Sequence, residues 1–151
     1  MNAIKLLFLV CLCSSAAAAQ VNCVRPELAH QSRDVATIQR LEKAWTLAYL
    51  SGDTEFERCL LTSDFMEIMK DGSINRLSEE LALAAKNKGK NVTNPPMAPE
   101  SFHLHDNVAV AYGVLSDKPG DGNPRKMYFV DYYVWANGSW HVFFAQQTSY
   151  T

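Results

Sequence analysis

The sequence lacks the short motifs that mark the common nucleotide-dependent and hydrolytic enzymes. It has no G-x-x-x-x-G-K phosphate loop, no G-x-G-x-x-G dinucleotide fingerprint, no G-x-S-x-G nucleophile elbow and no H-E-x-x-H zinc motif. These absences weigh against nucleotide hydrolysis, hydride transfer on a Rossmann unit and zinc proteolysis. The sequence therefore predicts no bound cofactor and no metal centre.

An excess of positive charge is also lacking, because 14 lysines and arginines stand against 16 aspartates and glutamates. A broad nucleic-acid surface normally needs a basic excess, so we expect no nucleic-acid partner. No apolar run reaches the roughly 20 residues that a membrane-spanning helix requires. The chain has 151 residues, 48% of them hydrophobic and with no internal repeat, which predicts one globular domain.

The N-terminus has the pattern of a secretory signal peptide. Lys5 is followed by apolar residues at 6–13 and by four alanines that end at Ala19. We expect residues 1–19 to be removed and the protein to be exported, to a periplasm or as a secreted protein. An uncleaved membrane anchor is the alternative, although the apolar run is short for one.

Two of the four cysteines, Cys23 and Cys59, remain after the predicted cleavage. Two cysteines in an oxidising compartment favour a single disulfide, which would tie the new N-terminus to a helical segment. The alternative is two buried thiols without a bond.

The mature chain predicts short helices followed by antiparallel strands, which is an α+β protein. Residues 20–32 have no clear period and predict an extended tail, and residues 33–151 form the domain. Periodic apolar residues and turn residues predict helices at 33–50, 54–61 and 78–87, an extended segment at 63–69, and strands at 100–105, 108–116, 125–136 and 139–150. A proline-rich linker at 94–99 and a turn at 118–124 separate some of these elements.

The last two strands are joined by Asn137-Gly138, a strong signal for a two-residue hairpin turn. With that turn, Trp135 pairs with Trp140, and an unbroken register pairs Phe129 with Gln146. Both faces of the hairpin are then largely apolar, although an antiparallel sheet with one wet face normally has one polar side. One face must pack on the helices, and we expect a second copy of the chain to cover the other. The sequence thus predicts a homodimer.

The order and spacing of several short motifs resemble the nuclear transport factor 2-like superfamily. These motifs include Leu41-Glu42-Lys43-Ala44-Trp45, Ser51-Gly52-Asp53, Asp64-Phe65, Asp71-Gly72, Tyr132-Tyr133-Val134, Gly138-Ser139-Trp140 and Gln146-Gln147-Thr148. Within the superfamily, which includes ketosteroid isomerase and the SnoaL-like cyclases, the sequence looks most like an uncharacterised bacterial branch. The resemblance implies a cone, in which a curved antiparallel sheet wraps around N-terminal helices and leaves an apolar pocket at its open end. It implies no particular activity, because this fold carries enzymes and binding modules alike.

Candidate site residues fall into two groups. Asp131 and Glu67 are strand carboxylates that would act as general bases if desolvated, or would otherwise serve a structural hydrogen bond. The residues that would line a pocket for a flat apolar ligand, or would otherwise be plain core, are Trp45, Tyr49, Phe65, Phe129 and Tyr133. Gln146 would orient a carbonyl group of the ligand, or would otherwise only form a hydrogen bond with Asp131. His103, His105 and His141 would make a zinc site only if they converged, and no neighbouring sequence supports that.

Three functions remain open on this basis. The first is an exported protein that binds a small apolar ligand in the cone. The second is an isomerase or dehydratase that uses a pocket carboxylate. The third is a dimerisation scaffold whose cone is filled by side chains.

Overall fold

The structure is a computed structural model that describes residues 23–92, 100–117 and 125–150. The predicted signal peptide, the linker at 94–99 and the turn at 118–124 lie outside these described residues. Within them, no helix combines the length and the apolar character needed to cross a membrane.

The helices are set by clear start and stop signals. A short 3-10 helix, η1 (Pro26–Leu28), precedes α1 (Val35–Ser51), α2 (Thr54–Leu60) and α3 (Leu77–Ala85). The side chains of Asp34 and Asp53 cap α1 and α2 by accepting backbone N–H bonds of 2.7 and 3.0 Å. Gly52 ends α1 in the left-handed region at φ 77°, as a helix-terminating glycine does. The three α-helix predictions are confirmed, with bounds within two residues.

Six strands form one open sheet in the order β2-β1-β6-β5-β4-β3. The strands are β1 (Leu61–Ile68), β2 (Ile74–Arg76), β3 (Glu100–His105), β4 (Val108–Asp117), β5 (Arg125–Ala136) and β6 (Ser139–Tyr150). All neighbours are antiparallel except β1 and β6, which run parallel, so the sheet is mixed. The α+β class is confirmed, and the short strand β2 was not predicted.

The predicted hairpin register holds only for the four residue pairs next to the turn. Trp135 pairs with Trp140 and Tyr133 with Val142, as expected, but a β-bulge then shifts the register by one residue. Beyond the bulge, Phe129 pairs with Gln147 instead of Gln146. The predicted Phe129–Gln146 pair is therefore wrong, because one extra residue in β6 turns every later side chain to the opposite face.

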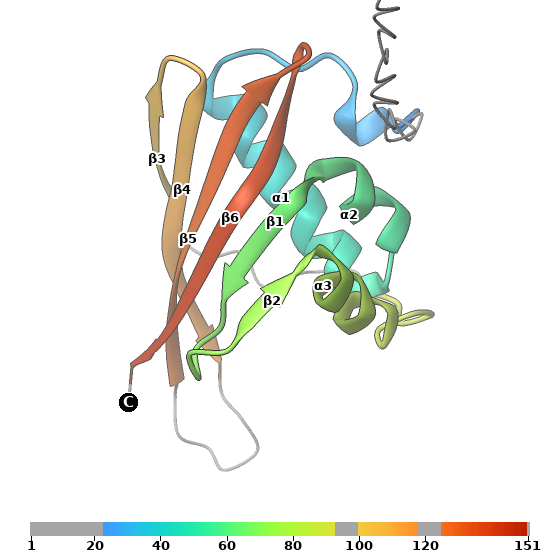
Figure 1. Ribbon diagram of the computed structural model, residues 1–151, viewed down its shortest axis with the longest axis vertical. Helices are drawn as coiled ribbons and strands as arrows, with labels where there is room; N and C mark the ends of the chain where they lie inside the picture. The colour runs from blue at the N-terminus through green and yellow to red at the C-terminus, as the bar shows by residue number, and fades with distance from the viewer. Residues whose placement is uncertain (1–22, 93–99, 118–124, 151) are drawn as a thin grey trace, which may run out of the picture.

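All three α-helices lie on one side of the twisted sheet (Figure 1). The core fills the space between them and the sheet, with α1 running along the inner face. Its fully buried large side chains are Ile38, Leu41, Phe56, Leu60, Phe65, Tyr133, Trp140 and Val142. The other sheet face has no helix over it among the described residues, and Tyr112 and Tyr128 are 46% and 45% exposed there.

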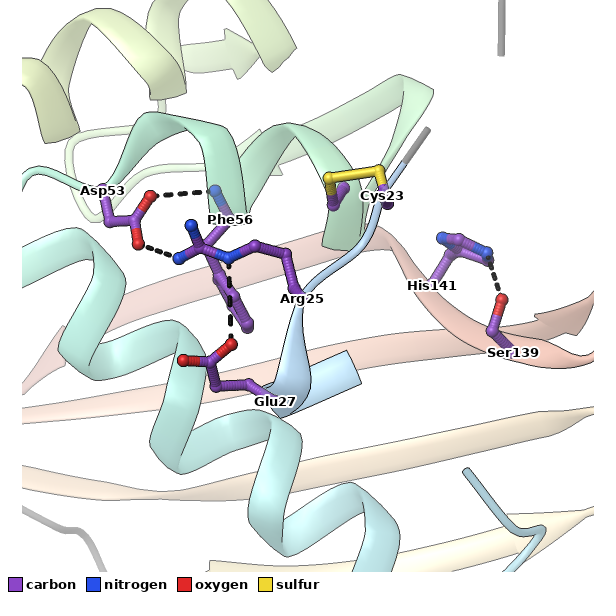
Figure 2. Close-up of a disulfide and its surroundings, with 8 residues drawn as sticks. Cys23, Arg25, Glu27, Asp53, Phe56, Ser139 and His141 are labelled. Carbon is purple, nitrogen blue, oxygen red and sulfur yellow. Dashed lines mark hydrogen bonds and ion pairs between the residues drawn. A yellow bond between two sulfur atoms is a disulfide. The ribbon is translucent and has the colours of Figure 1, made fainter. Parts of the chain in front are cut away.

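The N-terminal segment is tied to the domain at both of its ends. Cys23 is joined to Cys59 of α2 by a disulfide, which confirms the predicted pair. Figure 2 shows Arg25 next to this bond, with its guanidinium paired to Asp53 and close to the Phe56 ring. At the other end, the indole Nε1 of Trp140 donates to the Ser32 carbonyl over 2.9 Å. The segment described from residue 23 onwards is thus part of the folded domain.

Candidate ligand cavity

A cavity of about 420 Å³ lies between α1, α3 and the inner face of the sheet. It is lined by Glu42, Trp45, Thr46, Tyr49, Leu50, Glu67, Met69, Lys70, Glu80, Leu115, Met127, Phe129, Asp131 and Gln147. These residues come from α1, from β1 and the turn that follows it, from α3, and from β4, β5 and β6. The volume is within the range of small-molecule sites.

Small side chains in the sheet explain why this end is hollow. Asp131 on β5 is flanked by Ala111 on β4 and Ala145 on β6, and Phe129 is flanked on β4 by Gly113. Because opposed residues point to the same face, these positions leave open space beside Asp131 and Phe129. At the other end of the sheet, Trp135 and Trp140 fill the corresponding space with their rings 5.3 Å apart.

Four carboxyl side chains line the cavity from four different elements. Glu42 comes from α1, Glu67 from β1, Glu80 from α3 and Asp131 from β5. Each is buried, with 4–7% of its surface exposed. Lys70, also in the lining, is exposed to solvent. Four buried carboxyl groups around one cavity are unusual, because acidic side chains are seldom fully buried.

Glu67 and Glu80 form an interacting pair. Burial raises the pKa of Glu80, and the neighbouring Glu67 charge raises it further. Burial also raises the pKa of Glu67, opposed by hydrogen bonds from Glu80 and Gln147. The Gln147 amide donates to Glu67 Oε1 over 2.6 Å. We therefore expect Glu80 to keep its proton at neutral pH and to share it with Glu67.

A hydrogen bond from Tyr133 holds the Glu42 side chain. The Tyr133 hydroxyl donates to Glu42 Oε1 over 2.5 Å, and the tyrosine itself is completely buried. A short bond to a carboxylate is stronger than one between neutral groups, so this contact holds the Glu42 side chain in position.

Glu57 is a buried residue of α2 and is not part of the cavity lining. It is completely buried, and neither of its carboxyl oxygens has a hydrogen-bond partner. Burial, followed by the charges of Asp53 and Glu67, raises its pKa to about 8. Burial and the charges of Glu80, Glu67 and Glu57 likewise raise the pKa of Tyr49. The carboxyl groups in this part of the molecule therefore influence one another through low-dielectric surroundings.

The structure brings five of the eight predicted site residues to the cavity and leaves three outside it. Asp131, Glu67, Trp45, Tyr49 and Phe129 line the cavity. Phe65 is completely buried behind Trp45, in edge-to-face contact at 6.2 Å, and Tyr133 lies under Glu42. Gln146 is exposed on the opposite sheet face. Gln147 lines the cavity at the position that was predicted for Gln146.

The three histidines are spread across the outer sheet face. His103 and His105 are exposed on the edge strand β3, whereas His141 is on β6, three strands away. Figure 2 shows His141 bonded to Ser139, over 2.8 Å. Across the described residues, no three His, Cys, Asp or Glu side chains are placed to hold a metal ion.

Sequence reasoning missed Glu42 and Glu80, although a signal was present for both. Glu42 lies four residues after Ile38 and three before Trp45, so it falls on the inward stripe of α1. Glu80 adjoins Leu81 and precedes Ala84 by four residues on α3, and all three are buried. A charged residue on a buried helical stripe is a functional candidate, because its position contradicts its polarity.

Comparison with known proteins gives a fold but no established activity. No protein-family model and no curated protein matches the sequence. A solved NTF2-like protein from Cytophaga hutchinsonii matches with a TM-score of 0.64 at 18% identity, covering 80% of this chain and 100% of that one. A putative Ca/calmodulin-dependent kinase II association domain from Exiguobacterium sibiricum matches with a TM-score of 0.64 at 19% identity, covering 81% and 97%.

Other matches point to the same fold. The association domain of C. elegans CaMKII matches with a TM-score of 0.62 at 15% identity, covering 75% of this chain and 93% of that one. An NTF-2 like protein of unknown function from Silicibacter pomeroyi matches with a TM-score of 0.63 at 14% identity, covering 77% and 95%. Identities this low carry the fold alone, and the resemblance noted in the sequence is confirmed at that level. The chain has the nuclear transport factor 2-like fold.

Proposed function

We propose that this protein is an exported binding protein that holds a small, largely apolar ligand in the cavity. The observation that carries the proposal is the cavity itself, about 420 Å³ between α1 and the sheet, with Trp45, Tyr49 and Phe129 among its walls. Apolar and aromatic walls with a few placed polar groups are typical of small-molecule sites. A scaffold with a filled cone would not retain such a space.

Export is supported by the Cys23–Cys59 disulfide, because such bonds persist mainly in oxidising compartments. It agrees with the signal-peptide pattern of residues 1–19 in the sequence. A periplasmic or secreted location is therefore part of the proposal.

A neutral fluorescent probe tests whether the cavity binds apolar molecules. N-phenyl-1-naphthylamine should gain fluorescence with wild-type protein, and Leu115→Trp should weaken its binding at least tenfold because the indole enters the cavity. Glu55→Trp is the control, since Glu55 is exposed on α2 and does not line the cavity. Equal binding by wild type and Leu115→Trp would place the probe elsewhere. Native mass spectrometry of protein from its source would then look for a retained ligand.

An enzyme of the isomerase or dehydratase type is the second candidate, favoured by the buried Glu67–Glu80 pair. Carboxyl groups with raised pKa values in a cavity are suited to moving protons near neutral pH. Asp131, which lines the cavity from β5, is the further carboxylate that this chemistry would use. Incubation of the recovered ligand with fresh protein separates the candidates, because only an enzyme changes its covalent structure.

We also propose that the outer sheet face forms a homodimer. Tyr112 and Tyr128 are each nearly half exposed, and partly buried Val114 and Val130 lie beside them in the register of β4 and β5. Large exposed apolar patches mark interaction sites. Two solved proteins of this fold are described as association domains, which adds support.

The dimer is tested by charging this face. Tyr112→Lys together with Tyr128→Lys should convert a dimer of the mature protein into a monomer in sedimentation velocity at micromolar concentration. Glu55→Lys is the control, because it makes the same change of two charge units on α2, on the other side of the sheet. A wild-type protein that sediments as a monomer would contradict the proposed dimer.

A further inference from the structure

We propose that the ligand of the cavity is an organic ammonium ion, with its protonated amine beside Glu67 and Glu80 and its apolar body against Trp45, Tyr49 and Phe129. This inference rests on the proposed binding function and specifies the chemical class of its ligand. The ligand is then largely apolar, as proposed above, but carries a single positive charge.

The cavity wall is acidic at Glu67 and Glu80. Glu67 and Glu80 face the cavity from β1 and α3 and are 5% and 4% exposed. No ion pair reaches either carboxyl group from the part of the chain that the structure describes. Lys70 is exposed at the edge of the lining. The pair therefore lies in the cavity wall without a cation from the described protein.

The Glu67–Glu80 pair can bind a cation in place of the proton that it shares. Two carboxyl groups this close cannot both ionise in a low-dielectric site, so they retain a proton when no cation is present. An ammonium group brings a positive charge and three N–H donors, so it would donate hydrogen bonds to both carboxylates. The shared proton, by contrast, makes only one hydrogen bond between them. The pair thus has acceptor capacity that a cationic ligand uses and a neutral ligand leaves unused.

Much of the remaining cavity wall is aromatic or apolar. Trp45 and Tyr49 are one helical turn apart on α1, and Phe129 lines the cavity from β5. Aromatic faces attract cations and also pack against apolar groups, so they suit the body of an amphiphilic amine. Met69, Met127 and Leu115 add adaptable apolar surface.

Geometry also distinguishes an organic cation from a metal ion. The four lining carboxyl groups come from four elements around the cavity, and the described residues place no three potential ligands where one ion would contact them. A cation that carries its own apolar body would instead occupy the volume and reach only the Glu67–Glu80 side.

The test compares three indole probes that differ mainly in charge. Tryptamine is cationic at pH 7, tryptophol is its neutral analogue and indole-3-acetate is anionic. In calorimetric titrations of the wild-type protein, tryptamine should bind at least tenfold more tightly than tryptophol, and indole-3-acetate should bind most weakly. Equal or tighter binding of tryptophol overturns this inference and leaves the binding function standing. Failure of all three probes and of the neutral naphthylamine overturns both.

Two variants locate the preference within the cavity. Glu80→Gln should reduce the preference for tryptamine over tryptophol to less than threefold, and Glu67→Gln should act in the same direction. Glu55→Gln is the control, because Glu55 is an exposed glutamate on α2. A preference for tryptamine that survives both cavity variants would place its amine elsewhere and overturn the assignment.

Discussion

Replacing Glu57 with methionine should raise the free energy of unfolding at pH 8 by about 1–4 kcal/mol, the range found when well-packed apolar side chains replace buried ion pairs. Glu57 is completely buried, and its two carboxyl oxygens have no hydrogen-bond partner. Methionine has a similar length and no polar atoms, so it fits the same space without a desolvation cost.

The sign of the effect follows from the raised pKa of Glu57. Its carboxyl group titrates near 4.5 in the unfolded chain but at about 8 in the fold. Between these values the folded state holds a proton that the unfolded state has lost, so the stability of the wild type falls as pH rises through this window. The window corresponds to a loss on the order of 5 kcal/mol for a fully buried group. Glu80, whose pKa is also raised, adds a loss of the same sign.

Chemical denaturation at pH 5, 6.5 and 8 measures this prediction. The gain from Glu57→Met should increase with pH, and a smaller fall of stability should remain in the variant because the Glu67–Glu80 pair is still present. Glu55→Met is the matched control, since Glu55 is exposed on the same helix and should show no pH-dependent gain. Parallel curves for wild type and Glu57→Met would contradict the assignment of a raised pKa to Glu57.

The fold was largely predictable because its elements carry strong local signals. Asn137-Gly138 adopts positive φ angles of 53° and 84°, as a two-residue hairpin turn requires, and Gly52 ends α1 with a positive φ. Apolar periodicity located the three helices and the four C-terminal strands. The parallel pairing of β1 with β6 has no local signal, because it joins segments about 80 residues apart and is set by packing of the whole chain.

The cavity was less predictable because hydrophobic periodicity treats charged residues as solvent-facing. Glu42, Glu57 and Glu80 all lie on inward helical surfaces, yet their residue type predicts exposure. Pattern alone identified Glu67 and Asp131, because strand alternation places them on a known face. It could not show that carboxyl groups from α1, β1, α3 and β5 surround one space.

The misplaced glutamine has a specific physical origin. Gln146 and Gln147 are adjacent, and strand alternation sends them to opposite faces, so the register alone decides which one enters the cavity. The β-bulge between the Tyr133–Val142 and Tyr132–Phe144 pairs reverses that choice. Two consecutive phenylalanines, Phe143 and Phe144, occur at this point and give no alternation from which the bulge could be inferred.

Breaking the Cys23–Cys59 disulfide should lower the free energy of unfolding by about 3–4 kcal/mol, as the chain-entropy model gives for a loop of this size. The bond links residues 36 apart, so it removes many conformations from the unfolded chain. Cys23→Ala is the informative variant because Cys23 is exposed, whereas Cys59 is 8% exposed and also contributes packing. With total stabilities of roughly 5–15 kcal/mol in small domains, this loss is a large fraction.

Four denaturation curves separate the covalent bond from the contacts beside it. Cys23→Ala with and without reductant should match the reduced wild type, and all three should fall below the oxidised wild type by the same amount. Arg25→Met is the control, because it removes the partly exposed ion pair to Asp53 and should cost under about 1 kcal/mol. If reduction left the wild-type curve unchanged, the bond would not stabilise the fold. If the wild type loses this free energy of unfolding only when it is reduced, its stability depends on an oxidising compartment. That compartment is the one predicted from the first 19 residues.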